Sequence, residues 1–311
     1  MKAECLTDPG GGNGLPRALP DREASRRWRS LTRTRLLILV VLALSAFAGN
    51  SLLCRVALKT TSIDAATFTA VRVVSGALVL WLIVRVRDRA HALGGNFDSA
   101  LALFAYAATF SFAYAQLPAG TGALLLFGAV QATMIGHGLS TGERLRLRQI
   151  CGLALALCGL VSLMLPGVAA PPLRASMLML VSGVAWSIYS LRGRGAGDPL
   201  RTTAGNFVRA VPFAALLAIA MRSSLVADPF GIALAIASGT LTSGVGYAIW
   251  YTALPGLRAT YAATVQLSVP VIAAAGGVVF LDEHMTLRLL IAAAAILGGI
   301  ALVVVVRPPA K

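Results

Sequence analysis

The sequence contains little charge and few of the residues on which soluble enzymes depend. Only 13% of its 311 residues are charged, three are histidine and four are cysteine. It has no HExxH, GxSxG or Walker motif and no CxxC or Cys/His cluster. These absences leave no recognisable metal site, nucleotide loop or catalytic triad. We therefore expect a protein that is not an enzyme and that uses no metal or cofactor.

Apolar residues, by contrast, are abundant and run in long segments. They make up 57% of the chain, and the mean hydropathy is +0.79. A helix that crosses a bilayer needs roughly 20 largely apolar residues, and backbone amides in lipid must be bonded within their own helix. The sequence therefore predicts an all-α polytopic membrane protein with ten transmembrane helices. They are predicted at residues 36–58, 65–84, 98–116, 119–140, 148–165, 174–192, 201–220, 230–253, 259–280 and 287–306.

The basic residues are distributed unevenly between the two ends of these helices. If the N-terminus is cytoplasmic, 20 Lys and Arg fall on the cytoplasmic side and 5 on the other. This asymmetry follows the positive-inside rule and predicts that both termini are cytoplasmic. The net charge of +15 then reflects topology and contact with lipid headgroups, not binding to nucleic acid. Arg far outnumbers Lys, which suggests a GC-rich bacterial genome and hence an inner membrane.

Residues 1–35 are rich in Gly, Pro and charge, which predicts a disordered basic cytoplasmic tail. An alternative interpretation takes LVVLALSA as a signal peptide cleaved after Ala46. The preceding region is long for a signal peptide, however, and the apolar run continues past that position. We therefore interpret the segment as part of the first span.

Two halves of the chain resemble each other in sequence. A shift of 140 residues places Glu143 on Glu283, Arg148 on Arg288 and Gly159 on Gly299. Nearer the start of each half, a shift of 137 residues places Tyr114-Ala-Gln-Leu-Pro118 on Tyr251-Thr-Ala-Leu-Pro255 and Arg72 on Arg209. The two repeats would be residues 36–165 and 174–306. Each contains five helices, an odd number, so the second repeat must enter the membrane from the opposite side. Such inverted repeats are typical of transporters that expose one site alternately to each face.

Several motifs resemble those of the drug/metabolite transporter superfamily, in its EamA-type branch of ten-helix carriers. They are AFAGNSLLCRVAL, FTAVRVVSGALVL and STGERLRLRQICGLALALCG in the first half, and GYAIWYTALP, VPVIAAAGGVVFLDEHMTLRLL and AILGGIALVV in the second. One position departs from the family pattern. Where the fourth helix usually carries a proline, echoed here by Pro270, this chain has Val130 and Gln131, which puts a kink in that helix in doubt.

The resemblance implies a secondary-active transporter that exports small metabolites such as amino acids. A nucleotide-sugar or phosphate-ester exchanger of the same superfamily is the alternative within transport. A membrane scaffold or membrane enzyme is the alternative outside it. The expected partners are a small-molecule substrate and the lipid bilayer, with a homodimer possible through glycine-rich helix faces.

The candidate substrate-binding residues are polar or aromatic groups placed within the spans. No Asp or Glu lies inside a span, so Arg72 and Arg209 lack a buried acid; they either reach carbonyl groups near helix ends or attract an anionic substrate group. The resemblance implies that the third, fourth, eighth and ninth helices line the central cavity. The full set comprises Asn50, Arg72, Tyr114, Gln131, Trp186, Tyr189, Arg209, Tyr247 and Gln266.

Two further features predict structural roles. Gly152 with Gly159, and Ala292 with Gly299, are spaced seven apart on one helix face, as close packing requires. We expect these faces to join the fifth and tenth helices to their own halves. Glu143 and Glu283 each precede a helix, where a carboxylate stabilises the positive end of the helix dipole.

Overall fold

The structure is a computed structural model that describes residues 32–87, 92–142, 146–165, 170–193, 197–257, 262 and 265–305. Over these residues the chain is helical, without a strand. The helices of the first half are α2 (Arg33–Thr60), α3 (Ala65–Arg87), α4 (Phe97–Tyr114), α5 (Ala119–Ser140) and α6 (Leu147–Met164). Those of the second half are α7 (Leu173–Arg192), α8 (Pro199–Ala220), α9 (Pro229–Ala237), α10 (Gly246–Ala253), α12 (Ser268–Leu281) and α13 (Leu287–Val305).

Short polar residues begin several of these helices. The side chain of Asn96 accepts a hydrogen bond from the amide of Ser99, which starts α4. Asp198 accepts from the amides of Leu200 and Arg201 at the start of α8, and Asp228 caps α9 in the same way. Because the first amides of a helix have no partner within it, such caps set the point at which each helix starts.

The eighth predicted span is a composite of three helical types. A π-helical segment, Ser238–Val245, separates α9 from α10, and a 3₁₀ turn at Leu254–Gly256 follows α10. In the ninth predicted span, α12 begins at Ser268, and much of the chain before it lies outside the described residues. The fourth span, α5, is one continuous α-helix from Ala119 to Ser140, as the absence of a proline allows.

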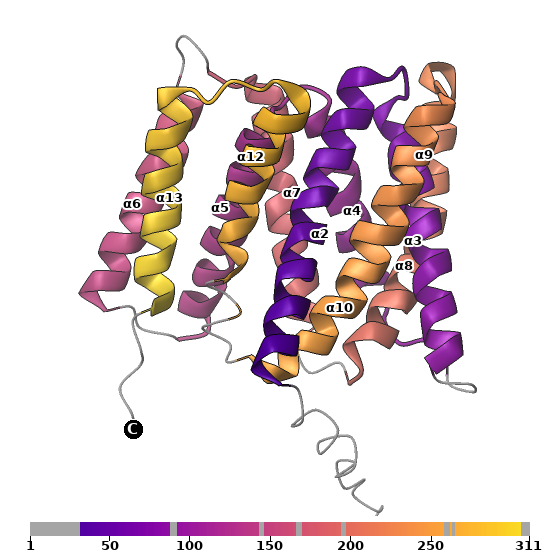
Figure 1. The fold of residues 1–311 in the computed structure, drawn as a ribbon, viewed down its shortest axis with the longest axis horizontal. Coiled ribbons are helices and arrows are strands. Elements are labelled where there is room, and N and C mark those ends of the chain that lie inside the picture. The colour runs from indigo at the N-terminus through magenta and orange to yellow at the C-terminus, as the bar shows by residue number, and fades with distance from the viewer. Residues whose placement is uncertain are drawn as a thin grey trace, which may run out of the picture.

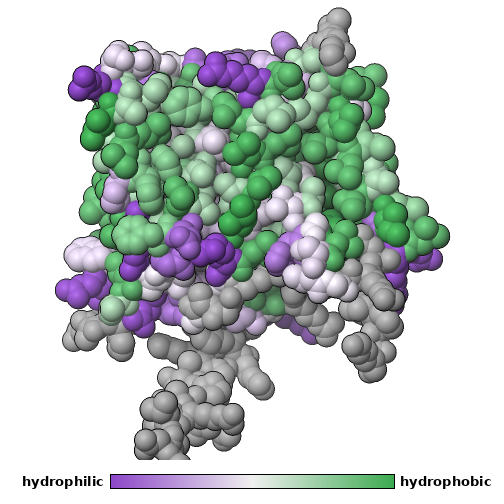
Figure 2. Space-filling view, turned by 180° about the vertical axis from the view of Figure 1, so that it is seen from behind, coloured by the Kyte–Doolittle hydropathy of each residue, from purple (hydrophilic) through white to green (hydrophobic). Residues whose placement is uncertain are grey.

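The surface of the bundle is that of a multi-pass membrane protein. Figure 2 shows a broad hydrophobic band with hydrophilic residues above and below it. Large apolar side chains such as Leu78, Val279 and Phe280 are exposed on the helices. By length and hydropathy, six of the described helical stretches could each cross a membrane: α2, α3, α5, α6, α8 and the stretch from α9 to Gly256. The remaining helices, α4, α7, α12 and α13, complete the same bundle (Figure 1).

The two halves of the bundle run in opposite directions. In Figure 1, α2 begins and α13 ends at the lower edge, which we call the terminal side; the upper edge is the opposite side. Helices at equivalent positions in the two halves pack against each other, namely α3 with α8 and α6 with α13. The packing of α4 on α7 is mirrored by that of α10 on α2. The all-helical, inverted-repeat architecture expected from the sequence is therefore present.

Small residues hold α6 and α13 together at one end of the bundle. A Cβ added to Gly152 would lie 2.6 Å from the carbonyl oxygen of Gly299, and one added to Gly299 would lie 2.4 Å from that of Gly152. Gly159 similarly faces Ala292 and Ala295. The expectation that these faces join each helix to its own half is therefore wrong. They join the two halves to each other, because only small residues allow two backbones this close.

Candidate functional site

A cavity of about 440 Å³ lies at the centre of the bundle, between the two halves. Its wall extends from Asn50 and Thr242, at the middle of their spans, to Gly193, Pro199 and Leu254 at helix ends on the terminal side. Its other main lining residues are Phe47, Ser51, Tyr106, Phe110, Gln131, Met134, Trp186, Tyr189, Thr202, Thr203, Asn206, Ser243, Tyr247, Trp250, Tyr251 and Gln266. None of the described lining residues is acidic or basic.

Aromatic rings form one wall of this cavity. Trp186 on α7 stacks on Tyr247 on α10, with centroids 5.6 Å apart and an interplanar angle of 18°. Tyr247 in turn stacks on Tyr251 at 6.3 Å and 22°. Phe47 on α2 meets the edge of Trp250 at 5.8 Å. Such a surface suits a flat apolar group, which gains contact area against rings that lose little conformational freedom on binding.

The inner end of the cavity is polar and is organised around Asn50. Its amide nitrogen donates to the hydroxyl of Tyr106 at 3.3 Å. Its amide oxygen accepts from the hydroxyls of Ser238 at 2.9 Å and Thr242 at 3.3 Å. The last two residues belong to the π-helical segment, and π segments inside α-helices frequently occur at functional sites.

Close packing brings this π segment against α3. A Cβ added to Gly239 would lie 2.3 Å from the carbonyl oxygen of Arg72 and 2.0 Å from Oγ of Ser75. Gly76 on α3 faces the carbonyl oxygen of Gly239 at 3.2 Å in the same way. Any larger residue at position 239 would therefore push the segment away from α3 and displace the partners of Asn50.

Arg72 lies behind the inner end of the cavity and is only 2% exposed. Its Nη2 donates to the hydroxyl of Tyr106 at 3.3 Å, and its guanidinium lies 5.4 Å from the ring of Tyr106 and 5.0 Å from that of Phe110. Its Nη1 has no hydrogen-bond partner among the described residues, and no described carboxylate pairs with it. Arg72 thus does not reach a helix end. It is a buried charge in contact with two residues of the cavity wall.

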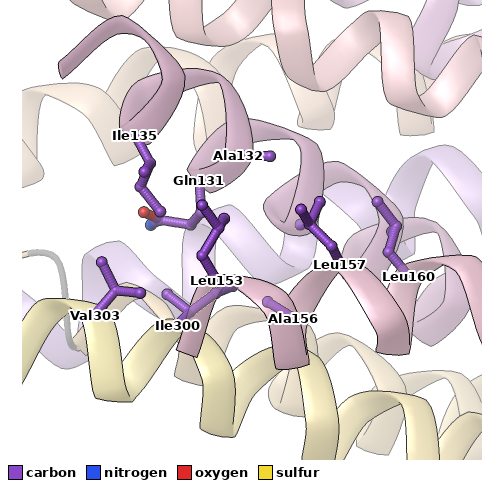
Figure 3. Close-up of a pocket in the computed structure, with 10 residues that line it drawn as sticks. Gln131, Ala132, Ile135, Leu153, Ala156, Leu157, Leu160, Ile300 and Val303 are labelled. Carbon is purple, nitrogen blue, oxygen red and sulfur yellow. The ribbon is translucent and has the colours of Figure 1, made fainter. Parts of the chain in front are cut away.

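Six of the nine residues predicted from the sequence line the cavity: Asn50, Gln131, Trp186, Tyr189, Tyr247 and Gln266. Tyr189 donates to the hydroxyl of Thr203 at 3.2 Å, so that α7 and α8 are joined at the wall. Gln131 also borders a small crevice between α5, α6 and α13. Figure 3 shows its side chain among Ile135, Leu153 and Val303.

The other predicted residues lie outside the cavity. Arg72 is behind its wall. Arg209 donates to the carbonyl oxygens of Gly94 at 2.7 Å and Gly205 at 3.0 Å. Of the two roles expected for the arginines, it therefore has the one in which the guanidinium binds backbone carbonyl groups. Tyr114 is fully buried near the opposite side, and its hydroxyl donates to the carbonyl oxygen of Ala119 at 3.2 Å.

Polar contacts close the bundle on the opposite side. Nε of Arg55 lies 3.0 Å from Oε1 of Glu283, and Nη1 of Arg55 donates to the carbonyl oxygen of Tyr114 at 3.0 Å. Oε2 of Glu283 accepts from the amide of Ala119, the first residue of α5, at 2.7 Å. Glu283 therefore stabilises the start of α5 instead of the helix that follows it, which corrects the sequence expectation. Glu143 lies outside the described residues.

The sequence reasoning missed Tyr106, which joins Arg72 to Asn50. A usable signal was present, because Tyr106, Phe110 and Tyr114 are spaced by four and so share one face of α4. Their rings follow one another at 5.4 and 4.6 Å. Tyr251 also lies in the cavity wall, although it was not among the predicted binding residues.

Comparison with known proteins assigns the family. The model of the EamA-like transporter family matches residues 173–305. A protein of Pseudomonas aeruginosa, described as uncharacterized protein PA1977, is 57% identical over 274 residues, which cover 88% of this chain and 96% of that protein. The chain belongs to the EamA-like transporter family. EamA-like transporters form part of the drug/metabolite transporter superfamily.

The architecture also has a counterpart of known structure. A crystal structure with 18% sequence identity superposes with a TM-score of 0.62 and covers 88% of this chain and 98% of the other. At this identity the likeness concerns the fold alone. This EamA-like protein therefore shares its overall helical arrangement with a chain that is distant in sequence.

Proposed function

We propose that this EamA-like protein is a secondary-active transporter that exports small metabolites such as amino acids by alternating access. The family assignment supports transport, and the proposal adds the substrate class, the direction and the mechanism. The basic residues favour an inner-membrane location with both termini in the cytoplasm. The terminal side of the bundle would then face the cytoplasm.

The observation that carries the mechanism is the one-sided cavity. Its wall reaches helix ends on the terminal side, whereas Arg55, Glu283 and Tyr114 pack together on the opposite side. A site that is reached from one face and sealed from the other corresponds to one of the two states that alternating access requires. Under the proposed orientation, this state takes up solute from the cytoplasm.

The repeat suggests how the second state would form. Tyr114 and Tyr251 are equivalent in the two halves, yet Tyr251 lines the cavity and Tyr114 is buried on the sealed side. If the halves exchange conformations, Tyr114 becomes exposed to the cavity and Tyr251 becomes buried. The contacts between α6 and α13 would remain, because their mutually inserted glycines leave little room for sliding.

The absence of charged residues from the described cavity wall bears on the alternative substrate. A nucleotide sugar or phosphate ester carries a phosphate group, which proteins usually bind with several Arg, Lys or helix amides. Arg72 contacts this wall from behind, through the hydroxyl of Tyr106, and does not itself line the cavity. The cavity therefore favours a small solute with a flat apolar part over a phosphate ester.

Counterflow in proteoliposomes tests the proposal. The purified protein is reconstituted with an excess of one unlabelled amino acid inside, and uptake of the same labelled amino acid is followed across a panel. Transient accumulation supports a carrier, and chemical conversion of the solute supports a membrane enzyme. Empty liposomes provide the background. Reporter tags that place both termini outside the cytoplasm would overturn the proposed direction.

A further inference from the structure

The inner end of the cavity holds an unusual combination of a buried cation and an unused hydroxyl proton. The Arg72 side chain carries a guanidinium group, a cation. Burying a charge without a counter-ion is unfavourable, and here the described partners of the guanidinium are the Tyr106 hydroxyl and the rings of Tyr106 and Phe110. Among the described residues, its Nη1 has no hydrogen-bond partner. The site therefore retains uncompensated positive charge.

Tyr106 lies between the Arg72 guanidinium and the cavity. Its hydroxyl oxygen accepts two hydrogen bonds, from Nη2 of Arg72 and from Nδ2 of Asn50, both at 3.3 Å. Both bonds use the oxygen as acceptor, so the hydroxyl proton is free to donate elsewhere. Among the described residues it has no acceptor, and Tyr106 lines the cavity. Two donors on the same oxygen also polarise the hydroxyl and make it a stronger donor.

The surrounding groups define what this donor would bind. Asn50 cannot rotate its amide oxygen toward the cavity without giving up Ser238 and Thr242. No described lining residue is an acid, so nothing in the wall compensates a cationic ligand by ion pairing. A ligand that places an anionic acceptor against Tyr106 would offset the charge of Arg72. Its apolar part would lie along Trp186 and Tyr247.

We propose that Arg72, Tyr106 and Asn50 form a carboxylate subsite, in which Tyr106 donates to the ligand and Arg72 acts through Tyr106. The ligand class is a small monocarboxylate that carries a flat apolar or aromatic group. This inference rests on the proposed transport function, since it names the substrate of the same cavity. Arg72 is a positioning and electrostatic residue here, and Tyr106 is the residue in contact with the ligand.

The test compares three probes of nearly equal size: phenylacetate, phenylacetamide and phenethylammonium. Binding of each radiolabelled probe to the full-length protein in detergent is measured by equilibrium dialysis. Wild type should bind phenylacetate about tenfold more tightly than phenylacetamide, because a charge-assisted hydrogen bond is worth more than a neutral one. Phenethylammonium should bind least.

The variants separate the subsite from a purely structural role. Arg72→Gln should bring phenylacetate and phenylacetamide to nearly equal affinity, whereas Arg72→Lys should keep a preference for phenylacetate. Tyr106→Phe should weaken the binding of phenylacetate by about tenfold. This variant removes a single oxygen atom and keeps the ring, so it provides the test if Arg72→Gln fails to fold. Arg85→Gln removes a cation that lies over Trp81, far from the cavity wall, and should behave as wild type.

Three outcomes would overturn the subsite: tightest binding of phenethylammonium, an unchanged phenylacetate preference in Arg72→Gln, or no saturable binding of any probe at millimolar concentration. Dialysis measures binding without transport, so these outcomes do not test the carrier hypothesis, which the counterflow assay tests separately. Conversely, if the protein binds phenylacetate as expected but shows no counterflow of any solute, the subsite is supported and the proposed transport function is contradicted.

Discussion

Arg55 and Glu283 are separated by 228 residues in sequence and form an ion pair at 3.0 Å, with side chains that are 12% and 9% exposed. The pair connects α2 in the first half to the segment between α12 and α13 in the second. Removing one member of a buried pair leaves the other charge without compensation, at a cost of roughly 3–5 kcal/mol in typical proteins. Under the proposed alternating-access mechanism, the pair would favour the state in which the opposite side is sealed.

Breaking this pair should open the opposite side. In a background where Cys5, Cys151 and Cys158 are replaced by Ser, Cys54 is the remaining thiol; it is buried and precedes Arg55. We expect Glu283→Gln to increase the rate of Cys54 labelling by a membrane-impermeant maleimide added from the opposite side. The reason is that Glu283 holds both Arg55 and the start of α5.

Asp98→Asn is the matched control for that experiment. Asp98 pairs with Arg192 at 2.7 Å on the terminal side, where both side chains are more exposed. Loss of this pair should leave the labelling of Cys54 unchanged. Equal labelling in wild type and Glu283→Gln would show that the ion pair does not hold the closed side.

The junction of α6 and α13 should tolerate no added methyl group. A Cβ at position 299 would lie 2.4 Å from the Gly152 carbonyl oxygen and 2.7 Å from the Ala156 amide nitrogen, whereas one at position 298 meets nothing within 4 Å. We expect Gly299→Ala to destabilise the protein by about 1–3 kcal/mol, as overpacking does. Gly298→Ala should be neutral or stabilising, because alanine favours the helix. Thermal unfolding in detergent compares the two neighbouring variants.

Asp64 should contribute pH-dependent stability at the opposite side. It accepts from the amides of Ala66 and Val226 and from both the amide and the hydroxyl of Thr67. Burial raises the pKa of Asp64, but these hydrogen bonds outweigh burial and leave the pKa below its ordinary value of 3.8. The stabilisation is therefore complete above that value and is lost as the pH falls through the lower, folded-state pKa.

The variant Asp64→Ala measures this contribution. At pH 7 it should be less stable than wild type by about 1 kcal/mol, the usual effect of losing a helix-capping side chain. The difference should shrink as the pH is lowered through the folded-state pKa, since the wild-type carboxylate then becomes protonated. Thermal unfolding across a pH series gives the comparison. A difference that grew on acidification would contradict the assignment.

Trp186 should contribute to ligand binding through its stack on Tyr247. Trp186→Leu keeps an apolar side chain but removes the flat surface, so affinity for phenylacetate should fall by several-fold, in keeping with about 0.5–1.5 kcal/mol for an aromatic pair. Trp81→Leu is the control, because Trp81 is 44% exposed on the hydrophobic surface. Equal dialysis affinities in both variants would argue against an aromatic wall.

Much of the fold could be read from the residue pattern. The apolar segments predicted the spans because lipid requires continuous apolar helices. The capping residues Asn96 and Asp198, which start α4 and α8, were not predicted. The repeat relating Arg72 to Arg209 predicted the inversion. The composite eighth span was not predicted, because the Ser-, Thr- and Gly-rich stretch Ser238–Val245 lies inside a longer apolar run, and residue type alone does not distinguish a π-helix from an α-helix.

The candidate site was predicted less completely, since periodicity says little about which face of a buried helix meets a cavity. Asn50, Trp186 and Tyr247 were found because polar and aromatic side chains are uncommon in lipid-facing positions. Tyr106 was missed because its importance comes from Arg72 and Asn50, which lie 34 and 56 residues away in sequence.

Local chemistry thus sufficed to establish a ten-span, inverted-repeat membrane protein, since solvation by lipid acts on each segment independently. Long-range packing was needed to distinguish the two related arginines. Arg209 reaches nearby carbonyl groups, whereas Arg72 is enclosed by α4 and the π segment and remains close to the cavity. The same side chain at equivalent repeat positions has different neighbours because the two halves are packed differently around the cavity, whose wall reaches helix ends on the terminal side.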